Sequence, residues 1–312
     1  MSTPATRVAG AAVATEARPQ QKAPAAPEGY PAARRRVQFD WEKTPLHWVP
    51  DDAFSTHVMN VLHLLLPTGE RWFVEVVNKA TPQVRDPELL AAIKPFVRQE
   101  AWHAYAHQEV LKHLAAQGLD AKPFTERLDR YFRAVLSDHP RLPAFLQPWW
   151  LNRRLAVVAA IEHFTCVLGK WILENEELER IGADASMLDL LRWHGAEEVE
   201  HRALVWDVHD ELSGSHLQRV TAMLEVAVML SLRWYQAARF LMLNDPTLHG
   251  EKPTLRRWLR AAREKRLPSP GLLYGAVPRY MRRRHHPSQE ATTAWALQYL
   301  RRSPAASVAQ ID

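Results

Sequence analysis

The chain has 312 residues, 47% of them apolar, which is enough for a sizeable core in one large domain or two small ones. Its single cysteine, Cys166, excludes an internal disulfide framework and makes a reducing, cytoplasmic location the expected one. The net charge of +5 comes without a nucleic-acid-binding motif, so no nucleic-acid partner is expected. Glycine is scarce, at 11 residues, which favours helices over sheets.

The two ends of the chain differ in composition from its middle. Residues 1–36 are rich in Ala and Pro and lack the continuous apolar region of a secretory signal, so we expect a disordered tail. Residues 37–245 carry the long periodic stretches and are expected to form one helical domain, followed by a basic helical extension over residues 246–312. The most apolar stretch, 220–232, is interrupted by Glu225 and is shorter than the roughly 20 residues that span a bilayer.

Apolar residues recur at helical spacing from residue 51 onward, and no segment shows the alternation of a strand. The pattern therefore predicts an all-α fold. Pro67 is expected to end the first helix and Pro95 to kink or split the third, because proline cannot donate a backbone hydrogen bond. The expected helices cover residues 51–66, 68–80, 87–117, 124–136, 150–175, 185–212 and 216–243, followed by short helical pieces between 254 and 302.

Two of these helices carry acidic and imidazole side chains in the middle of an apolar stripe. In the helix over 87–117 these are Glu100 and His103, and in the helix over 185–212 they are Glu198 and His201. A buried carboxylate without a partner is costly. A metal ion would compensate, because it is a positive charge that all these side chains can share.

Each Glu-x-x-His motif follows a helix with an inward-facing glutamate of its own, Glu70 before the first motif and Glu162 before the second. The order Glu, Glu-x-x-His, Glu, Glu-x-x-His is that of the ferritin-like di-iron and di-manganese carboxylate proteins. We therefore expect a ferritin-like four-helix bundle core with additional helices. It would hold two metal ions, with iron as the first choice and manganese as the alternative. The six predicted ligands are Glu70, Glu100, His103, Glu162, Glu198 and His201.

The neighbouring polar residues have their own interpretations. The acids and imidazoles could form a buried ion-pair or hydrogen-bond network without metal, and several arginines could then be their partners. Those arginines are Arg71, Arg98, Arg153, Arg154 and Arg202. His107 could bind metal or hydrogen-bond a metal ligand, and a packed, hydrogen-bonded histidine is the plainer interpretation. His163 is expected to reach a metal ligand through a hydrogen bond at most. Glu197 and Glu200 flank Glu198 and are expected to face solvent or arginines.

Two segments carry a family resemblance. Ala101–His107 (AWHAYAH) and Trp193–Arg202 (WHGAEEVEHR) resemble the bacterial family of predicted metal-dependent hydrolases, and the resemblance extends over about residues 35–243. The ligand pattern is also similar to that of the p-aminobenzoate N-oxygenase group of di-iron proteins. That group has a third histidine four residues before the last Glu-x-x-His. His194 stands at this position, so the resemblance implies that it is a seventh ligand.

Two features outside the motifs concern substrate and partners. The 12 tryptophans are explained by core filling, and an apolar pocket for a hydrophobic or aromatic substrate is the functional alternative. The basic residues near the C-terminus would be a solvated surface in the plainest interpretation, and a peripheral membrane contact is the alternative. They are Arg256, Arg257, Arg260, Arg263, Lys265, Arg266, Arg279 and Arg282 to Arg284.

Three functions follow from this site. The first is a non-haem di-iron enzyme that activates dioxygen to oxidise a hydrophobic or aromatic small molecule, with an electron donor that the sequence does not identify. Mixed carboxylate and imidazole ligands suit iron, and carboxylates can shift between bridging and terminal positions. The alternative is a two-metal-dependent hydrolase, in which the metals lower the pKa of bound water. The second alternative is a non-catalytic protein that senses metal or oxygen.

Overall fold

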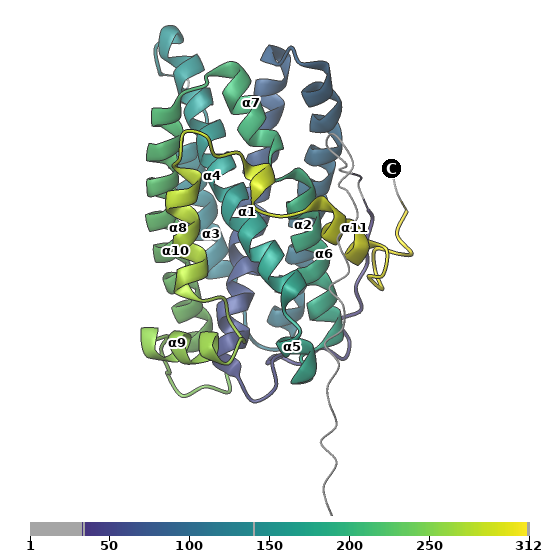
Figure 1. Ribbon diagram of the computed structural model, residues 1–312. Helices are drawn as coiled ribbons and strands as arrows, with labels where there is room; N and C mark the ends of the chain where they lie inside the picture. Colours follow the sequence, from purple (N-terminus) through teal and green to yellow (C-terminus); the bar gives the residue numbers. More distant parts are fainter. Residues whose placement is uncertain (1–32, 34, 140, 311–312) are drawn as a thin grey trace, which may run out of the picture.

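The computed structural model describes residues 33, 35–139 and 141–310, so the predicted tail lies outside the described residues except for Ala33, Arg35 and Arg36. The described chain is helical and contains no strand, as the all-α prediction required. Figure 1 shows its long helices side by side in one upright bundle, with the short α9 lying across one end.

The first two long helices form an antiparallel pair. They are α1 (Ala53–Ala80) and α2 (Pro87–Ala116), joined by a short 3-10 turn, Thr81–Gln83. The Asp52 side chain caps α1 by accepting a hydrogen bond from the backbone N–H of Ser55. Asp86 caps α2 in the same way.

The prediction that Pro67 ends the first helix is wrong, because α1 runs through Pro67 without a break. An interior proline costs a helix about 3 kcal/mol. Packing of α1 against α2, α3, α4 and α8 along its length outweighs this cost. Pro95 likewise lies inside an unbroken α2.

The middle of the chain supplies the other half of the bundle. α3 (Lys122–Tyr131) continues into a π-helical turn, Phe132–Leu136, and packs against α1. A second 3-10 turn, Ala144–Leu146, then leads into α4. The elements that follow are α4 (Gln147–Glu174), the short α5 (Glu177–Arg180), α6 (Ala185–His201) and α7 (Leu204–Leu212).

The prediction of one helix over 185–212 is also wrong, since α6 ends at His201 and α7 begins at Leu204. At the break, the guanidinium of Arg202 donates to the backbone carbonyl of Val199 and to the hydroxyl of Thr293. The last predicted metal ligand therefore sits at the C-terminal end of α6 rather than in mid-helix.

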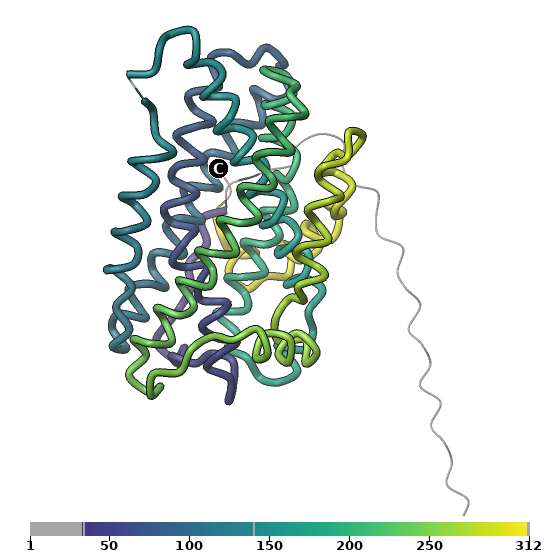
Figure 2. The backbone as a smooth tube through the Cα atoms, turned by 90° about the vertical axis from the view of Figure 1, so that its left-hand side faces the viewer, coloured from purple at the N-terminus to yellow at the C-terminus, as the bar shows by residue number. Residues whose placement is uncertain are grey.

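The C-terminal segment follows α8 (His216–Asn244) and packs on the outside of the bundle, as Figure 2 shows in light green to yellow. It contains α9 (Leu255–Arg263), α10 (Pro270–Tyr280), a 3-10 turn (Pro287–Gln289) and α11 (Thr293–Leu300). α10 packs on α4 and α8, and α11 packs on α6. Asp189 on α6 anchors this last segment through hydrogen bonds from the Tyr299 hydroxyl, the Ser303 hydroxyl and the Ala305 N–H.

α4 is the central helix and contacts α1, α6, α7, α8 and α10. By length and composition alone, the segment Ala144–Glu174 could also cross a membrane, the one such helix among the described residues. In the apolar window that meets this test, 72% of the residues are buried inside the fold. Burial on all sides accounts for an apolar composition all round the helix.

Two glycines let α4 and α6 cross in backbone contact. A Cβ built on Gly169 of α4 would lie 2.4 Å from the carbonyl oxygen of Gly195 on α6, and one built on Gly195 would lie 2.7 Å from Cα of Gly169. Any larger residue would have to push two backbones apart. This crossing therefore fixes the spacing between the helices that carry Glu162 and Glu198.

We expect Gly169→Ala to lower the free energy of unfolding by about 3 kcal/mol, at the upper end of overpacking costs, because the obstacle is backbone rather than a movable side chain. Urea unfolding followed by circular dichroism measures it. Gly69→Ala on α1 is the matched control, because no atom lies within 4 Å of its added Cβ. That variant should be more stable than wild type by about 0.5–1 kcal/mol. Equal stability of Gly169→Ala and wild type would contradict the close crossing.

Candidate metal centre

The structure brings all seven predicted ligands into the middle of the bundle. Glu70 comes from α1, Glu100 and His103 from α2, and Glu162 from α4. His194, Glu198 and His201 come from α6. None of the seven residues is more than 5% exposed. Four helices thus contribute to one buried cluster of carboxylates and imidazoles.

Six of the seven fall into two groups of four, in each of which one ligand atom per residue lies within 4.8 Å of the others. One group is Glu70, His103, His194 and Glu198, and the other is Glu100, His103, Glu198 and His201. Glu198 and His103 belong to both. The two groups are therefore adjacent, with a carboxylate between them that could serve both.

The individual distances show how the cluster is connected. His194 Nε2 lies 2.7 Å from Glu198 Oε1 and 3.5 Å from Glu70 Oε1. His201 Nε2 lies 3.2 Å from Glu100 Oε1, and its Nδ1 lies 2.9 Å from Glu162 Oε2. Glu162 is outside both groups of four, so it joins the cluster through His201.

Many polar atoms of this cluster have no hydrogen-bond partner although they are buried. They include both carboxylate oxygens of Glu70 and of Glu100, Oε1 of Glu162, Nδ1 of His103 and Nε2 of His201. His201 Nε2 and Glu100 Oε1 are 3.2 Å apart, but they do not meet in hydrogen-bonding geometry. Each orphaned buried group costs about 1–3 kcal/mol, and charged groups cost more. Carboxylate oxygens and imidazole nitrogens are metal donors, so the atoms left unpaired are of the type that a pair of metal ions would engage.

The pKa shifts of the cluster carboxylates also indicate a need for positive charge. Burial and the negative charge of neighbouring carboxylates raise the pKa of Glu70 and of Glu100 well above the usual range. Burial and Glu198 raise the pKa of Glu162 to about 7, against the opposing effect of His201. Although burial opposes it, neighbouring imidazoles lower the pKa of Glu198 to about 2. Although burial opposes it, Glu162 and Glu198 raise the pKa of His201 to about 9, which supplies one positive charge. Four ionised carboxylates cannot share this space without more positive charge than that.

Arginines do not supply that charge. Among the described residues, none of the five arginines considered as partners in a metal-free network makes an ion pair or hydrogen bond with a predicted metal ligand, and Arg202 bonds to Val199 and Thr293. Arg154 pairs with Asp138, Arg153 with Glu225, and Arg71 approaches Asp129 at 4.0 Å. This arrangement favours a metal-binding cluster over an ion-pair network.

A second layer of polar groups holds His103 in place. Glu197 Oε2 lies 2.9 Å from His103 Nε2, and Glu197 Oε1 accepts hydrogen bonds from Trp193 Nε1 at 3.0 Å and from Arg35 at 2.8 Å. With Nε2 donating to Glu197, Nδ1 of His103 is left to face the cluster. Arg35 also makes a two-pronged contact with Glu200, at 2.9 and 3.0 Å. Glu197 and Glu200 thus face an arginine, as expected, but both are buried.

The two other histidines singled out in the sequence differ in position. His107 Nε2 lies 2.5 Å from His194 Nδ1, and His107 Nδ1 lies 2.7 Å from His63 Nδ1. A chain of three imidazoles therefore leads out of the cluster. His163 is turned away toward the C-terminal segment, with its Nε2 3.3 Å from the carbonyl oxygen of Ala276.

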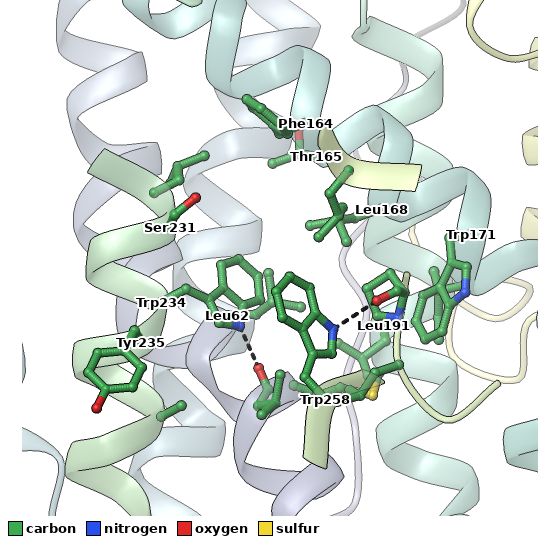
Figure 3. Close-up of a pocket in the computed structure, with 18 of the residues that line it drawn as sticks. Leu62, Phe164, Thr165, Leu168, Trp171, Leu191, Ser231, Trp234, Tyr235 and Trp258 are labelled. Atoms are coloured by element: carbon green, nitrogen blue, oxygen red, sulfur yellow. Dashed lines mark hydrogen bonds between the residues drawn. The ribbon is translucent and has the colours of Figure 1, made fainter. Parts of the chain in front are cut away.

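A cavity of about 400 Å³ ends at the cluster, where His194 and Glu198 form part of its wall. Its other walls are almost wholly apolar and come from α1, α4, α6, α8, α9 and α10. Figure 3 shows Trp234 and Trp258 on its lower side, with their indole N–H groups bonded to the backbone carbonyls of Val58 and Pro268. Their rings therefore present only apolar surface to the cavity. A space of this size suits a small apolar molecule.

The sequence interpretation missed several of these residues. Thr165 lines the cavity and donates a hydrogen bond to Glu198 Oε2, and its spacing of three from Glu162 was the available signal. His63 lies seven residues before Glu70, which places it two turns away on the same face of α1. Nothing in the sequence marks Arg35, because its acidic partners are more than 160 residues away.

Comparisons with known proteins bear on the family. The sequence profile of the family described as predicted metal-dependent hydrolase matches residues 33–291. A biosynthetic arginine decarboxylase of Vibrio cholerae is 38% identical over 97 residues, which are 27% of this chain and 15% of that enzyme. So local a similarity does not carry the enzyme's activity over. No solved structure matches the chain.

The family description agrees with metal dependence and with the hydrolase alternative better than with the dioxygen-activating enzyme expected first. The likenesses to ferritin-like proteins and to the N-oxygenase group remain predictions from ligand spacing. Since the profile covers most of the chain and includes every predicted ligand, the chain belongs to the family of predicted metal-dependent hydrolases.

Proposed function

We propose that this protein is a two-metal-dependent enzyme that acts on an apolar small molecule. One observation carries the proposal. The apolar cavity ends at His194 and Glu198, and these residues belong to a buried cluster whose donor atoms lack partners. Binding site and reactive centre are therefore adjacent.

The two groups of four suggest which residues would hold the ions. Glu70 and His194 are particular to one group, and Glu100 and His201 to the other. Glu198 is common to both and is the candidate bridging carboxylate. His103 is within reach of either ion, and Glu162 supports the second through His201. Mixed oxygen and nitrogen donors suit iron or manganese.

We take hydrolysis as the first reaction class, because the family description favours it. Paired metal ions would lower the pKa of a bound water and supply hydroxide near neutral pH. The chain's own residues would orient the substrate. The cavity walls hold its apolar part, and Thr165, Ser231 and His194 are polar groups of the wall near which a carbonyl could lie.

Oxidation of an apolar molecule by dioxygen is the second candidate. Two observations favour it. One is a cluster of four glutamates and three histidines, in which Glu162 takes part through His201. The other is a cavity with few groups able to bind a polar, hydrolysable bond. A ferrous pair would supply electrons to dioxygen, and an external donor would then have to restore them. The apolar walls would exclude bulk water from the reaction.

One set of assays separates these candidates. Protein reconstituted with Fe²⁺ or Mn²⁺ should retain about two ions per chain after desalting. Hydrolysis predicts cleavage of apolar aryl esters without oxygen uptake, and oxidation predicts rapid oxygen uptake by the ferrous protein. Glu198→Gln should lose whichever activity is found, and Glu75→Gln, an exposed carboxylate on α1, should keep it. Retention of less than one ion per chain would sink the proposal for both reactions.

A further inference from the structure

The exposed residues among those that line the cavity show where it opens to the surface. Tyr235 on α8, Leu255 on α9 and Tyr274 on α10 line the cavity, yet are 50%, 63% and 45% exposed. At the inner end, His194 and Glu198 are 5% and 3% exposed. The mouth therefore lies between α8, α9 and α10, on the side of the molecule where the C-terminal segment covers the bundle.

Further exposed apolar side chains surround this mouth. Val228 and Leu232 precede Tyr235 by seven and three residues, so they share its face of α8, and Leu259 lies one turn beyond Leu255 on α9. All three are exposed. Scattered exposed apolar residues need no explanation, but a group around the entrance of a pocket marks an interaction site. We call this group the rim patch: Val228, Leu232, Tyr235, Leu255, Leu259 and Tyr274.

The segment beside the rim patch is strongly basic. Residues 251–266 contain seven lysines and arginines against two glutamates, a net charge equal to that of the whole chain. On α9 the side chains of Trp258 and Ala261 pack inward, while Arg256, Arg260 and Arg263 are exposed beside Leu255 and Leu259. Exposed leucines next to exposed arginines are typical of a helix that lies in the plane of a lipid headgroup layer.

We propose that the rim patch and α9 dock on an anionic lipid surface, so that the cavity takes its apolar ligand directly from the bilayer. We choose a lipid surface as the partner that covers the rim patch because the charges are complementary. Arginines around apolar side chains match phosphate headgroups above acyl chains. A second copy of this chain is a poor occupant. A symmetric pair built on this surface would bring the two basic helices together.

Docking would let an apolar ligand enter the cavity without crossing water. An apolar molecule concentrates in membranes and is scarce in water, so an enzyme that opens its pocket against the bilayer avoids transfer through water. The identity of the ligand rests on the proposed function. The lipid contact does not, because it depends only on surface residues away from the metal cluster.

Flotation of the full-length protein with vesicles tests the contact. We expect binding to vesicles of phosphatidylcholine mixed with phosphatidylglycerol, little binding to phosphatidylcholine alone, and weaker binding as salt rises. Arg256→Gln with Arg263→Gln should weaken binding by about thirtyfold, on the basis of about 1 kcal/mol for each arginine near the surface. Leu259→Asp should also weaken it, because an added carboxylate opposes both insertion and charge attraction.

The control variant removes the same number of positive charges from a surface away from the rim patch. Arg283 and Arg284 are exposed and follow α10, and Arg283 is near His216, at the opposite end of α8 from α9. Arg283→Gln with Arg284→Gln should bind vesicles as wild type does. Equal weakening by both pairs would mean that net charge alone acts, and would overturn the docking surface.

Two further outcomes would overturn the inference. One is absence of binding to the anionic vesicles. The other is a stable dimer in light scattering that Leu232→Ser dissolves, since a second copy would then cover the rim patch. Metal content of each variant separates this inference from the proposed function. Flotation without metal retention leaves the lipid contact standing, and metal retention without flotation leaves the two-metal centre standing.

Discussion

Glu198→Gln is expected to abolish retention of both metal ions, whereas Glu70→Gln and Glu100→Gln are each expected to cost one ion. The reason is the sharing of Glu198 between the two groups, to which Glu70 and Glu100 contribute one each. Loss of a direct ligand should weaken binding by on the order of 100-fold or more, since loss of a group that merely hydrogen-bonds a ligand costs 10–100-fold. Elemental analysis after reconstitution with Fe²⁺ or Mn²⁺ and desalting gives the stoichiometry of each variant.

His209→Gln is the matched control for these variants. His209 is a buried histidine on α7 whose Nε2 lies 3.3 Å from Gln218 Oε1, and among the described residues it belongs to no group of possible metal ligands. It should keep both ions while sharing any general cost of altering a buried polar residue. Normal metal content in Glu198→Gln, or equal loss in His209→Gln, would contradict the two overlapping groups.

Arg35→Ala is expected to lower the free energy of unfolding by about 3–5 kcal/mol, the cost of removing one partner from a buried ion pair. Arg35 is the guanidinium that neutralises Glu197 and Glu200, and both carboxylates are buried. Without it, two carboxylates remain in a site of low polarity. Chemical denaturation of metal-free protein measures the loss without interference from metal binding.

The loss should depend on pH with a definite sign. Even with Arg35 present, burial raises the pKa of Glu197 and of Glu200. Without Arg35 the two pKa values rise further, so the folded variant prefers protonated carboxyls. Its stability is then retained below the unfolded pKa of Glu, about 4.3, and is lost as pH rises through the raised folded values. The gap to wild type should therefore widen from acid to neutral pH.

Glu200→Gln in the Arg35→Ala background tests whether the loss of stability comes from the unpaired carboxylates. It removes one of the two uncompensated charges, so it should recover part of the lost stability at neutral pH. In wild type the same change removes a partner from Arg35 and should destabilise. Opposite signs in the two backgrounds are the expected signature of a direct ion pair, and equal effects would refute it.

The helical fold and the cluster ligands follow from local sequence pattern. A helix repeats every 3.6 residues, so Glu100 and His103, or Glu198 and His201, are placed on one face by spacing alone. An acid and an imidazole in an apolar stripe need a compensating group, whichever helices meet there. For this reason the sequence alone could assemble Glu70, the two motifs and Glu162, which the structure brings together in one buried cluster.

Only the tertiary structure decided the features that depend on contacts between distant segments. α1 continues through Pro67 because several helices pack along it, and α6 stops at His201 where Arg202 bonds to Thr293, 91 residues further on. Arg35 reaches Glu197 across 162 residues. The cavity walls likewise come from six helices. Helical spacing determines which residues share a face of a helix, but it does not determine which helix faces pack together. That packing forms the cavity and its mouth, and it brings Glu197 and Arg35 together beside His103.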